Sequence, residues 1–109
     1  MRARILALGI GLYGTVAAAD GYVLGAGRWS CADVIETHEQ GSPIRQGQVV
    51  GWLLGYWSAA TFQRETRFVD IVEQVGGRKI YEANIAECRK APPETLLYRV
   101  ADSMIENTK

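Results

Sequence analysis

Histidine, cysteine and lysine are all scarce in this 109-residue chain, and their scarcity narrows the functions that it can perform. His38 is the only histidine, two cysteines are present, and the lysines are limited to Lys79, Lys90 and Lys109. The formal net charge is zero, because twelve basic side chains balance twelve acidic ones. A chain without excess positive charge has no electrostatic basis for binding nucleic acid or an anionic membrane. We therefore predict no nucleic-acid partner.

The chain also lacks the residue sets with which most enzymes perform catalysis. His38 lies on a polar stretch beside Glu36 and Glu39, and no serine sits in a nucleophile elbow. Two distant cysteines with one histidine make neither a zinc pattern nor a CxxC redox motif. No glycine-rich phosphate loop or acidic metal loop is present. The sequence therefore predicts a protein that is not an enzyme, with no cofactor or metal and with His38 as a solvated surface residue.

Residues 1–19 have the pattern of a cleavable signal peptide. Arg2 and Arg4 precede an uncharged, mostly apolar stretch at 5–16 that is too short to span a bilayer. A run of three alanines then supplies the small residues that a signal peptidase recognises, so we expect cleavage before Asp20. The alternative is a buried N-terminal helix, which the glycines of this segment would weaken. The pattern predicts an exported, periplasmic protein without a membrane anchor after cleavage.

Export would place both cysteines in an oxidising compartment, where they can form a disulfide. The exported chain, residues 20–109, would bury only about 60–65% of its unfolded surface, which makes its core marginal. An intramolecular bridge between Cys31 and Cys88 would stabilise the fold by about 4 kcal/mol on the chain-entropy model. A free thiol pair and an intermolecular bridge are the alternatives to this prediction.

The exported chain is predicted to form one small domain. A glycine-rich arm at residues 20–29 has no helical period and is expected to be extended, and residues 30–109 form the domain. Residues 68–75 mix apolar and acidic side chains without a clean period, so they form either a short helix or an irregular segment. Gly76-Gly77 is a break. Elsewhere the apolar spacing and the helix start signals predict four helices, at about residues 30–41, 43–62, 79–90 and 96–105.

The second predicted helix is the least polar stretch of the exported chain. Its large apolar side chains are either core or a protein-binding surface, since aromatic residues dominate binding hot spots. The candidate client- or partner-binding residues are Trp52, Leu53, Leu54, Tyr56, Trp57 and Phe62. A stripe of small residues recurs every four positions on one face of this helix, and it consists of Gly47, Gly51, Gly55 and Ala59. Such a stripe indicates close helix packing, either inside the monomer or across a homodimer.

Two blocks of the sequence resemble the HdeA family of periplasmic acid-stress chaperones. The first, WSCADV at residues 29–34, is similar to the Trp-Thr-Cys-acidic-Asp-Phe start of that family's first helix. The second is IAECRK at residues 85–90, followed by an amphipathic helix at 94–105. These segments are similar to the family's second-cysteine helix and its closing helix. With the apolar middle helix, the resemblance covers about residues 29–107.

The resemblance implies an all-α, four-helix HdeA-like domain in which the two cysteines are joined. It also implies a folded dimer near neutral pH that acid loosens, so that exposed apolar surface holds unfolding periplasmic proteins in solution. The residues permit such a cycle. Protonation of the twelve carboxylates leaves ten Lys and Arg side chains, His38 and the new N-terminus, a charge of about +12. Self-repulsion of that size destabilises a compact state.

A specific binding protein is the alternative function. The glycine stripe and the small number of lysines are closer to uncharacterised HdeA-like proteins and to Rap1a-type immunity proteins, which are also small, exported, helical and disulfide-bonded. Such a protein would act as an inhibitor or immunity protein for one partner and would have no chaperone activity. The two functions differ in whether acid is the signal and in whether the bound protein is unfolded or specific.

Overall fold

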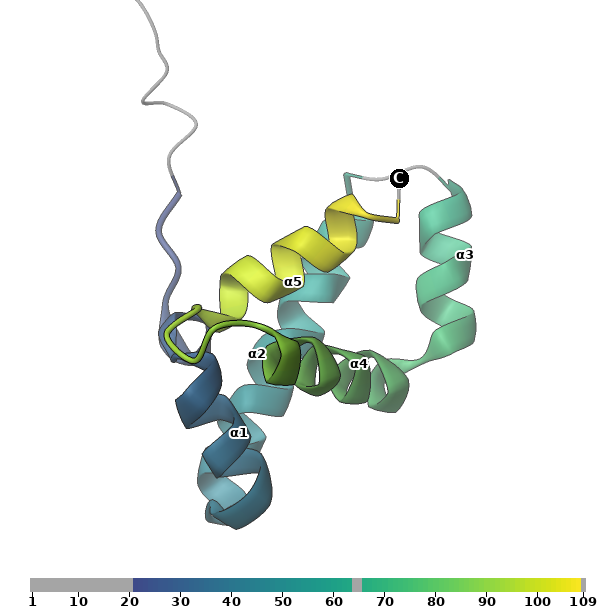
Figure 1. Ribbon diagram of the computed structural model, residues 1–109. Helices are drawn as coiled ribbons and strands as arrows, with labels where there is room; N and C mark the ends of the chain where they lie inside the picture. The colour runs from purple at the N-terminus through teal and green to yellow at the C-terminus, as the bar shows by residue number, and fades with distance from the viewer. Residues whose placement is uncertain (1–20, 64–65, 109) are drawn as a thin grey trace, which may run out of the picture.

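The computed structural model describes residues 21–63 and 66–108, and within these ranges the regular secondary structure is all helical (Figure 1). The only β-type pairing in the described ranges is a single bridge between Ser30 and Leu96. The elements in chain order are η3 (Gly25–Arg28), α1 (Cys31–Gln40), α2 (Pro43–Thr61), α3 (Thr66–Val75), α4 (Gly77–Lys90) and α5 (Leu97–Glu106). The all-α prediction is confirmed, whereas the predicted signal peptide lies outside the described residues. None of the described helices is long and apolar enough to cross a membrane.

Two predictions about the elements are wrong. The described part of the domain contains five α-helices rather than four, because residues 68–75, which the sequence left undecided, belong to α3. The arm that was expected to be extended contains the 3-10 helix η3, which buries Ala26 and Gly27. This helix forms through contact with α2 rather than through its own periodicity. Gly27 lies directly against the indole of Trp52, where a Cβ atom would overlap the ring.

Helices α1 and α2 begin at Ser30 and Ser42, the serines whose capping patterns gave the start signals of the first two predicted helices. The side-chain oxygen of Ser30 accepts a hydrogen bond from the backbone N–H of Asp33 at 3.1 Å, and Ser42 accepts one from Arg45 at 3.2 Å. Each cap satisfies an N–H group that has no partner inside the helix. The predicted break between α3 and α4 occurs at Gly76, whose φ of 82° is a conformation that other residues rarely adopt.

The Cys31–Cys88 disulfide joins the start of α1 to the end of α4, with the two Cα atoms 5.1 Å apart. Both cysteines are buried, so the predicted intramolecular bridge is confirmed. The backbone N–H of Cys31 also donates to the carbonyl oxygen of Thr95 at 2.7 Å, which holds the α4–α5 connection against α1. The buried apolar residues packed around the bridge, here called the disulfide core, are Ala26, Val34, Val49, Leu53, Ile85, Leu97, Val100 and Ala101.

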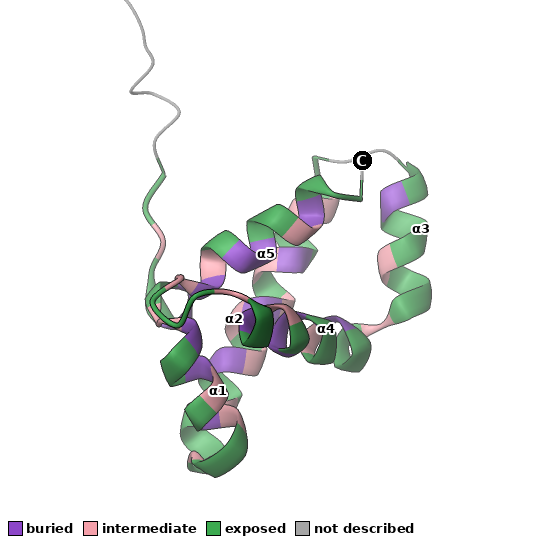
Figure 2. Ribbon diagram, in the orientation of Figure 1, coloured by how far each residue is buried: buried purple, intermediate pink, exposed green. Residues whose placement is uncertain are grey.

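A second, smaller apolar cluster lies toward the other end of α2. This end cluster consists of Trp57, Phe68, Ile80 and Ile105, from α2, α3, α4 and α5 respectively. The rings of Trp57 and Phe68 stack with their centroids 6.2 Å apart. Phe68 is the only buried residue of α3, and this helix lies at the edge of the bundle with a largely exposed surface (Figure 2). Helix α3 is therefore the least embedded of the α-helices.

Candidate functional site

The candidate binding residues of α2 do not form one continuous surface. Leu53 is fully buried in the disulfide core, and Trp57 is only 6% exposed within the end cluster. Phe62, at the end of the helix, is 88% exposed. The folded chain therefore uses Leu53 and Trp57 as core residues, and a partner could contact Leu53 only after the chain opens.

The half-buried members of the set hold neighbouring elements against α2. The rings of Trp52 and Tyr56 stack with centroids 4.8 Å apart, and the Tyr56 hydroxyl donates to a carboxylate oxygen of Asp102 on α5 at 3.4 Å. The side chain of Leu54 packs beside Gly77 at the start of α4. In the folded state these three side chains contribute to packing between helices.

The glycine stripe of α2 faces outward. Gly47, Gly51 and Gly55 are exposed, and a Cβ atom added at any of them would meet nothing within 4 Å in the described chain. Ala59, the fourth member of the stripe, is also exposed. No helix of the described monomer packs on this face. The spacing suggested packing either inside the monomer or across a homodimer. The described monomer leaves the three glycines uncovered, and the homodimer face stays a prediction.

Alanine substitutions of the stripe test whether it is covered by a second chain. In a monomer, Gly51→Ala should raise the free energy of unfolding by about 0.5–1 kcal/mol, because the methyl group has room and alanine is the better helix former. Urea denaturation measures the change. Gly27→Ala is the control, expected to destabilise by about 1–3 kcal/mol because its Cβ would overlap Trp52. A loss of stability in Gly51→Ala, with a smaller sedimenting species, would show that the stripe is a dimer contact.

An apolar cleft opens beside the end cluster, between α3, α4 and α5, with a volume of about 150 Å³. Apolar side chains form nearly all of its wall, and Lys79 is the only charged residue among the described residues that line it. This α3 cleft is lined by Trp57, Phe68, Ile71, Val72, Val75, Lys79, Ile80, Ala83, Met104 and Thr108.

The α3 cleft has two features that a packed core usually avoids. Its rim keeps apolar side chains in solvent, since Ile71 is 38% exposed and Val75 is 42% exposed. The indole N–H of Trp57 is buried without a hydrogen-bond acceptor among the described residues. An unpaired buried donor costs about 1–3 kcal/mol. Both features are typical of a surface that a ligand or partner completes.

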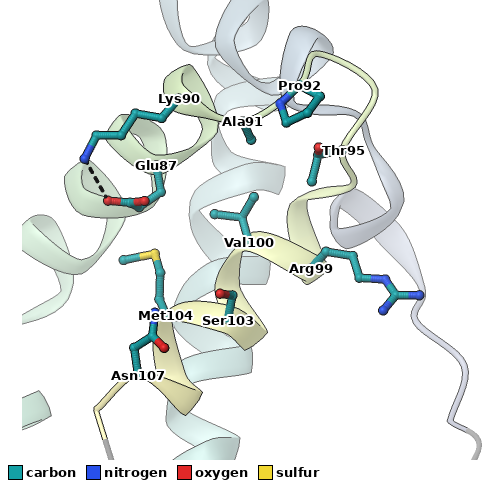
Figure 3. Close-up of a pocket in the computed structure, with 10 residues that line it drawn as sticks. All are labelled: Glu87, Lys90, Ala91, Pro92, Thr95, Arg99, Val100, Ser103, Met104 and Asn107. Carbon is teal, nitrogen blue, oxygen red and sulfur yellow. Dashed lines mark hydrogen bonds and ion pairs between the residues drawn. The ribbon is translucent and has the colours of Figure 1, made fainter.

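A wider hollow of about 530 Å³ lies between the end of α4, the α4–α5 connection and α5 (Figure 3). Lys90 reaches across its upper edge to Glu87, with 3.2 Å between the ammonium and carboxylate groups. Val100 and Met104 supply apolar wall, and the side chain of Arg99 extends away from the hollow. The hollow carries charges of both signs and is open to solvent, so it does not favour one class of ligand.

The only histidine of the chain lies at the interface between α1 and α4. His38 Nδ1 is 2.7 Å from the hydroxyl of Tyr81, and Arg89 donates to a carboxylate oxygen of Glu39 at 2.8 Å across the same interface. Burial raises the pKa of the Tyr81 phenol above its usual value of 10. His38 is half-buried and hydrogen-bonded, which corrects the expectation of a solvated residue. Within the described residues, no group of three potential metal ligands lies together.

No protein-family model, curated protein or solved structure matches this chain. The similarity to the HdeA family therefore depends on the two sequence blocks alone. The structure supplies an all-helical fold and a disulfide, and the function follows as a proposal from the geometry.

Sequence reasoning missed the contribution of α3 to the site. Phe68, Ile71, Val72 and Val75 follow the spacing i, i+3, i+4 and i+7, which is the apolar face of an amphipathic helix. The charged residues between them obscured this pattern in a segment only ten residues long. Counting the matches to a helical template would have identified this face.

Proposed function

We propose that this protein is an exported holdase that binds unfolding periplasmic proteins through apolar surface uncovered at low pH. The observation that carries the proposal is the division of the apolar interior into the disulfide core and the end cluster. Helix α3 closes the end cluster with a single buried residue, Phe68. Displacing α3 would uncover Trp57 and Ile80 while the disulfide still joined α1 to α4. The sequence blocks similar to the HdeA family support the same function.

Charge repulsion in acid provides a physical cause for this opening. With its carboxylates protonated, the exported chain approaches a charge of about +12, and self-repulsion favours expanded states. The electrostatic interaction between α3 and α4 also becomes more repulsive in acid. Once Asp70 and Glu73 on α3 are neutral, the charges left nearby are positive, from Arg67 on α3 and from Arg78 and Lys79 at the start of α4.

Loss of individual ion pairs is a minor part of this response. The pairs Arg89–Glu39 and Lys90–Glu87 would break as their carboxylates protonate, but the carboxylate side chains are about 45% exposed. Exposed pairs of this kind contribute about 0–1 kcal/mol each. The total charge is therefore the stronger effect.

The test follows the purified chain, residues 20–109, from pH 7 to pH 2. Tryptophan fluorescence, ANS binding and sedimentation report opening, and light scattering of an acid-sensitive client protein reports holdase activity. We expect ANS binding and suppression of client aggregation to begin together near pH 4, where carboxyl groups protonate. A chain that stays folded and lets the client aggregate would contradict the proposal.

A charge variant locates the acid response on α3. The double substitution Asp70→Asn/Glu73→Gln imitates protonation of α3, so opening should begin at a higher pH than in the parent protein. Glu36→Gln/Glu94→Gln removes the same charge at exposed positions outside α3 and is the matched control. Equal shifts in both variants would show that α3 has no special part in the response.

One observation favours the alternative of a specific binding protein. The α3 cleft is already present in the folded chain, with an exposed apolar rim at Ile71 and Val75. A preformed site suits a defined partner at neutral pH better than a range of unfolding proteins. The pH series separates the two functions, because a specific binding protein would remain rigid throughout it.

A further inference from the structure

We infer that the α3 cleft is a docking site, at neutral pH, for a protein segment that presents one large apolar side chain beside carboxylates. The inference goes beyond the proposed function, because it concerns the folded chain and needs neither acid nor displacement of α3. It follows from three properties of the cleft, which are its size, its wall and its charge.

The size of the cleft limits what can enter it. Its volume of about 150 Å³ is below the roughly 300–1,000 Å³ of pockets that hold cofactors and other small-molecule ligands. A cavity of about this volume accommodates benzene. One aromatic or branched side chain, such as that of phenylalanine or leucine, therefore fits the cleft better than a whole cofactor does.

The apolar wall and exposed rim of the cleft resemble the pocket that receives an anchor side chain in a protein interface. Phe68, Val72 and Ile80 offer apolar contact to an inserted side chain, and Trp57 also lines the cleft. Flanking residues of a bound segment would cover the exposed rim of the cleft. Interfaces concentrate binding energy at such anchors, which neighbouring contacts shield from water.

The charge of the cleft indicates which residues flank the anchor. Among the described residues that line it, Lys79 is the only charged one, and this lysine forms no ion pair with a described residue. A carboxylate beside the apolar anchor of a bound segment would be complementary to the ammonium group of Lys79.

The test titrates the purified protein at pH 7 with the capped peptide Ser-Asp-Phe-Glu-Ser and follows backbone amide chemical shifts. We expect the shifts to concentrate on α3 and on the first two turns of α4. Replacing the phenylalanine of the peptide by alanine should weaken binding about tenfold or more, because burial of the ring is lost. Replacing both acidic residues by lysine should weaken it about two- to fivefold.

Protein variants assign the binding to the cleft. Ala83→Phe should fill the cleft and weaken peptide binding about tenfold or more, whereas Ala86→Phe places the same ring on α4 outside the cleft. Lys79→Glu should weaken binding about two- to fivefold, with Arg78→Glu as the control for the same change of charge. All four positions are exposed, so circular dichroism should show the parent fold in each variant.

Several results would overturn the inference. These are the absence of amide shifts at millimolar peptide, equal binding of the alanine peptide, or equal losses in the variants and their controls. Tighter binding of octanoate than of the peptide would instead make the cleft a site for small amphipathic carboxylates. None of these results bears on the acid series, so failure of this inference leaves the proposed holdase function to its own test.

Discussion

Reduction of the Cys31–Cys88 disulfide should lower the free energy of unfolding by about 2–5 kcal/mol. The bridge joins the start of α1 to the end of α4, so its loss releases the unfolded chain from a large closed loop. It also lies inside the disulfide core, where both cysteines are almost completely inaccessible to solvent. Urea denaturation of the oxidised and reduced protein, with titration of the free thiols, measures the difference.

The reduced protein is compared with the double variant Cys31→Ala/Cys88→Ala, which cannot re-form the bridge and leaves no buried hydroxyl group. Both forms should lose a similar amount of stability. An unchanged melting temperature after reduction, with both thiols titrating as free, would contradict the account. It would mean that packing among the helices alone holds α1 against α4.

Substitutions in the two apolar clusters should have different effects on the fold. Leu53→Ala removes a fully buried side chain from the disulfide core, and we expect a loss of about 2–5 kcal/mol in the free energy of unfolding. Phe68→Ala removes the only buried side chain of α3, and it should release that helix while the disulfide core stays folded. The expected signs are less helical circular dichroism and a changed tryptophan emission, with a smaller shift of the main urea transition.

Ile44→Ala is the control for these substitutions, because Ile44 is 77% exposed on α2. A surface substitution of this kind should change the free energy of unfolding by no more than about 0.5 kcal/mol. If Leu53→Ala and Phe68→Ala gave equal losses in one shared transition, the end cluster would not be separable from the disulfide core. The proposed opening of α3 would then have no structural basis.

The features that could be predicted from the sequence are those that local chemistry determines. The caps at Ser30 and Ser42 each act on an N–H only three residues away, so a short motif was sufficient to find them. The disulfide followed from two cysteines and an inferred oxidising compartment. The inward face of the last helix followed from simple periodicity in an amphipathic segment.

The features that escaped prediction depend on contacts between distant segments. The 3-10 helix η3 depends on the approach of Gly27 to Trp52, which no local pattern in residues 20–29 encodes. The spacing of Gly51 and Gly55 correctly identified one face of α2. Whether another helix covers that face depends on the tertiary arrangement, and the structure leaves it exposed.

The candidate site, too, could be predicted from the sequence only in part. Composition and spacing made Trp57 a candidate client- or partner-binding residue, and the structure places it at both the end cluster and the α3 cleft. Its neighbours in the cleft come from α3, α4 and α5, so no single stretch of sequence contains the site. Phe62, by contrast, was grouped with the aromatic residues but lies exposed just after α2.

Hydrogen–deuterium exchange at pH 7 and pH 3 tests most directly whether acid opens α3 before the rest of the fold. Rates corrected for the intrinsic effect of pH are compared between α3 and the parts of α1 and α4 beside the disulfide. We predict that α3 loses its protection at pH 3, while residues 34–37 and 85–88 keep theirs. Equal protection of α3 at both pH values, or a uniform loss across all helices, would contradict the central claim.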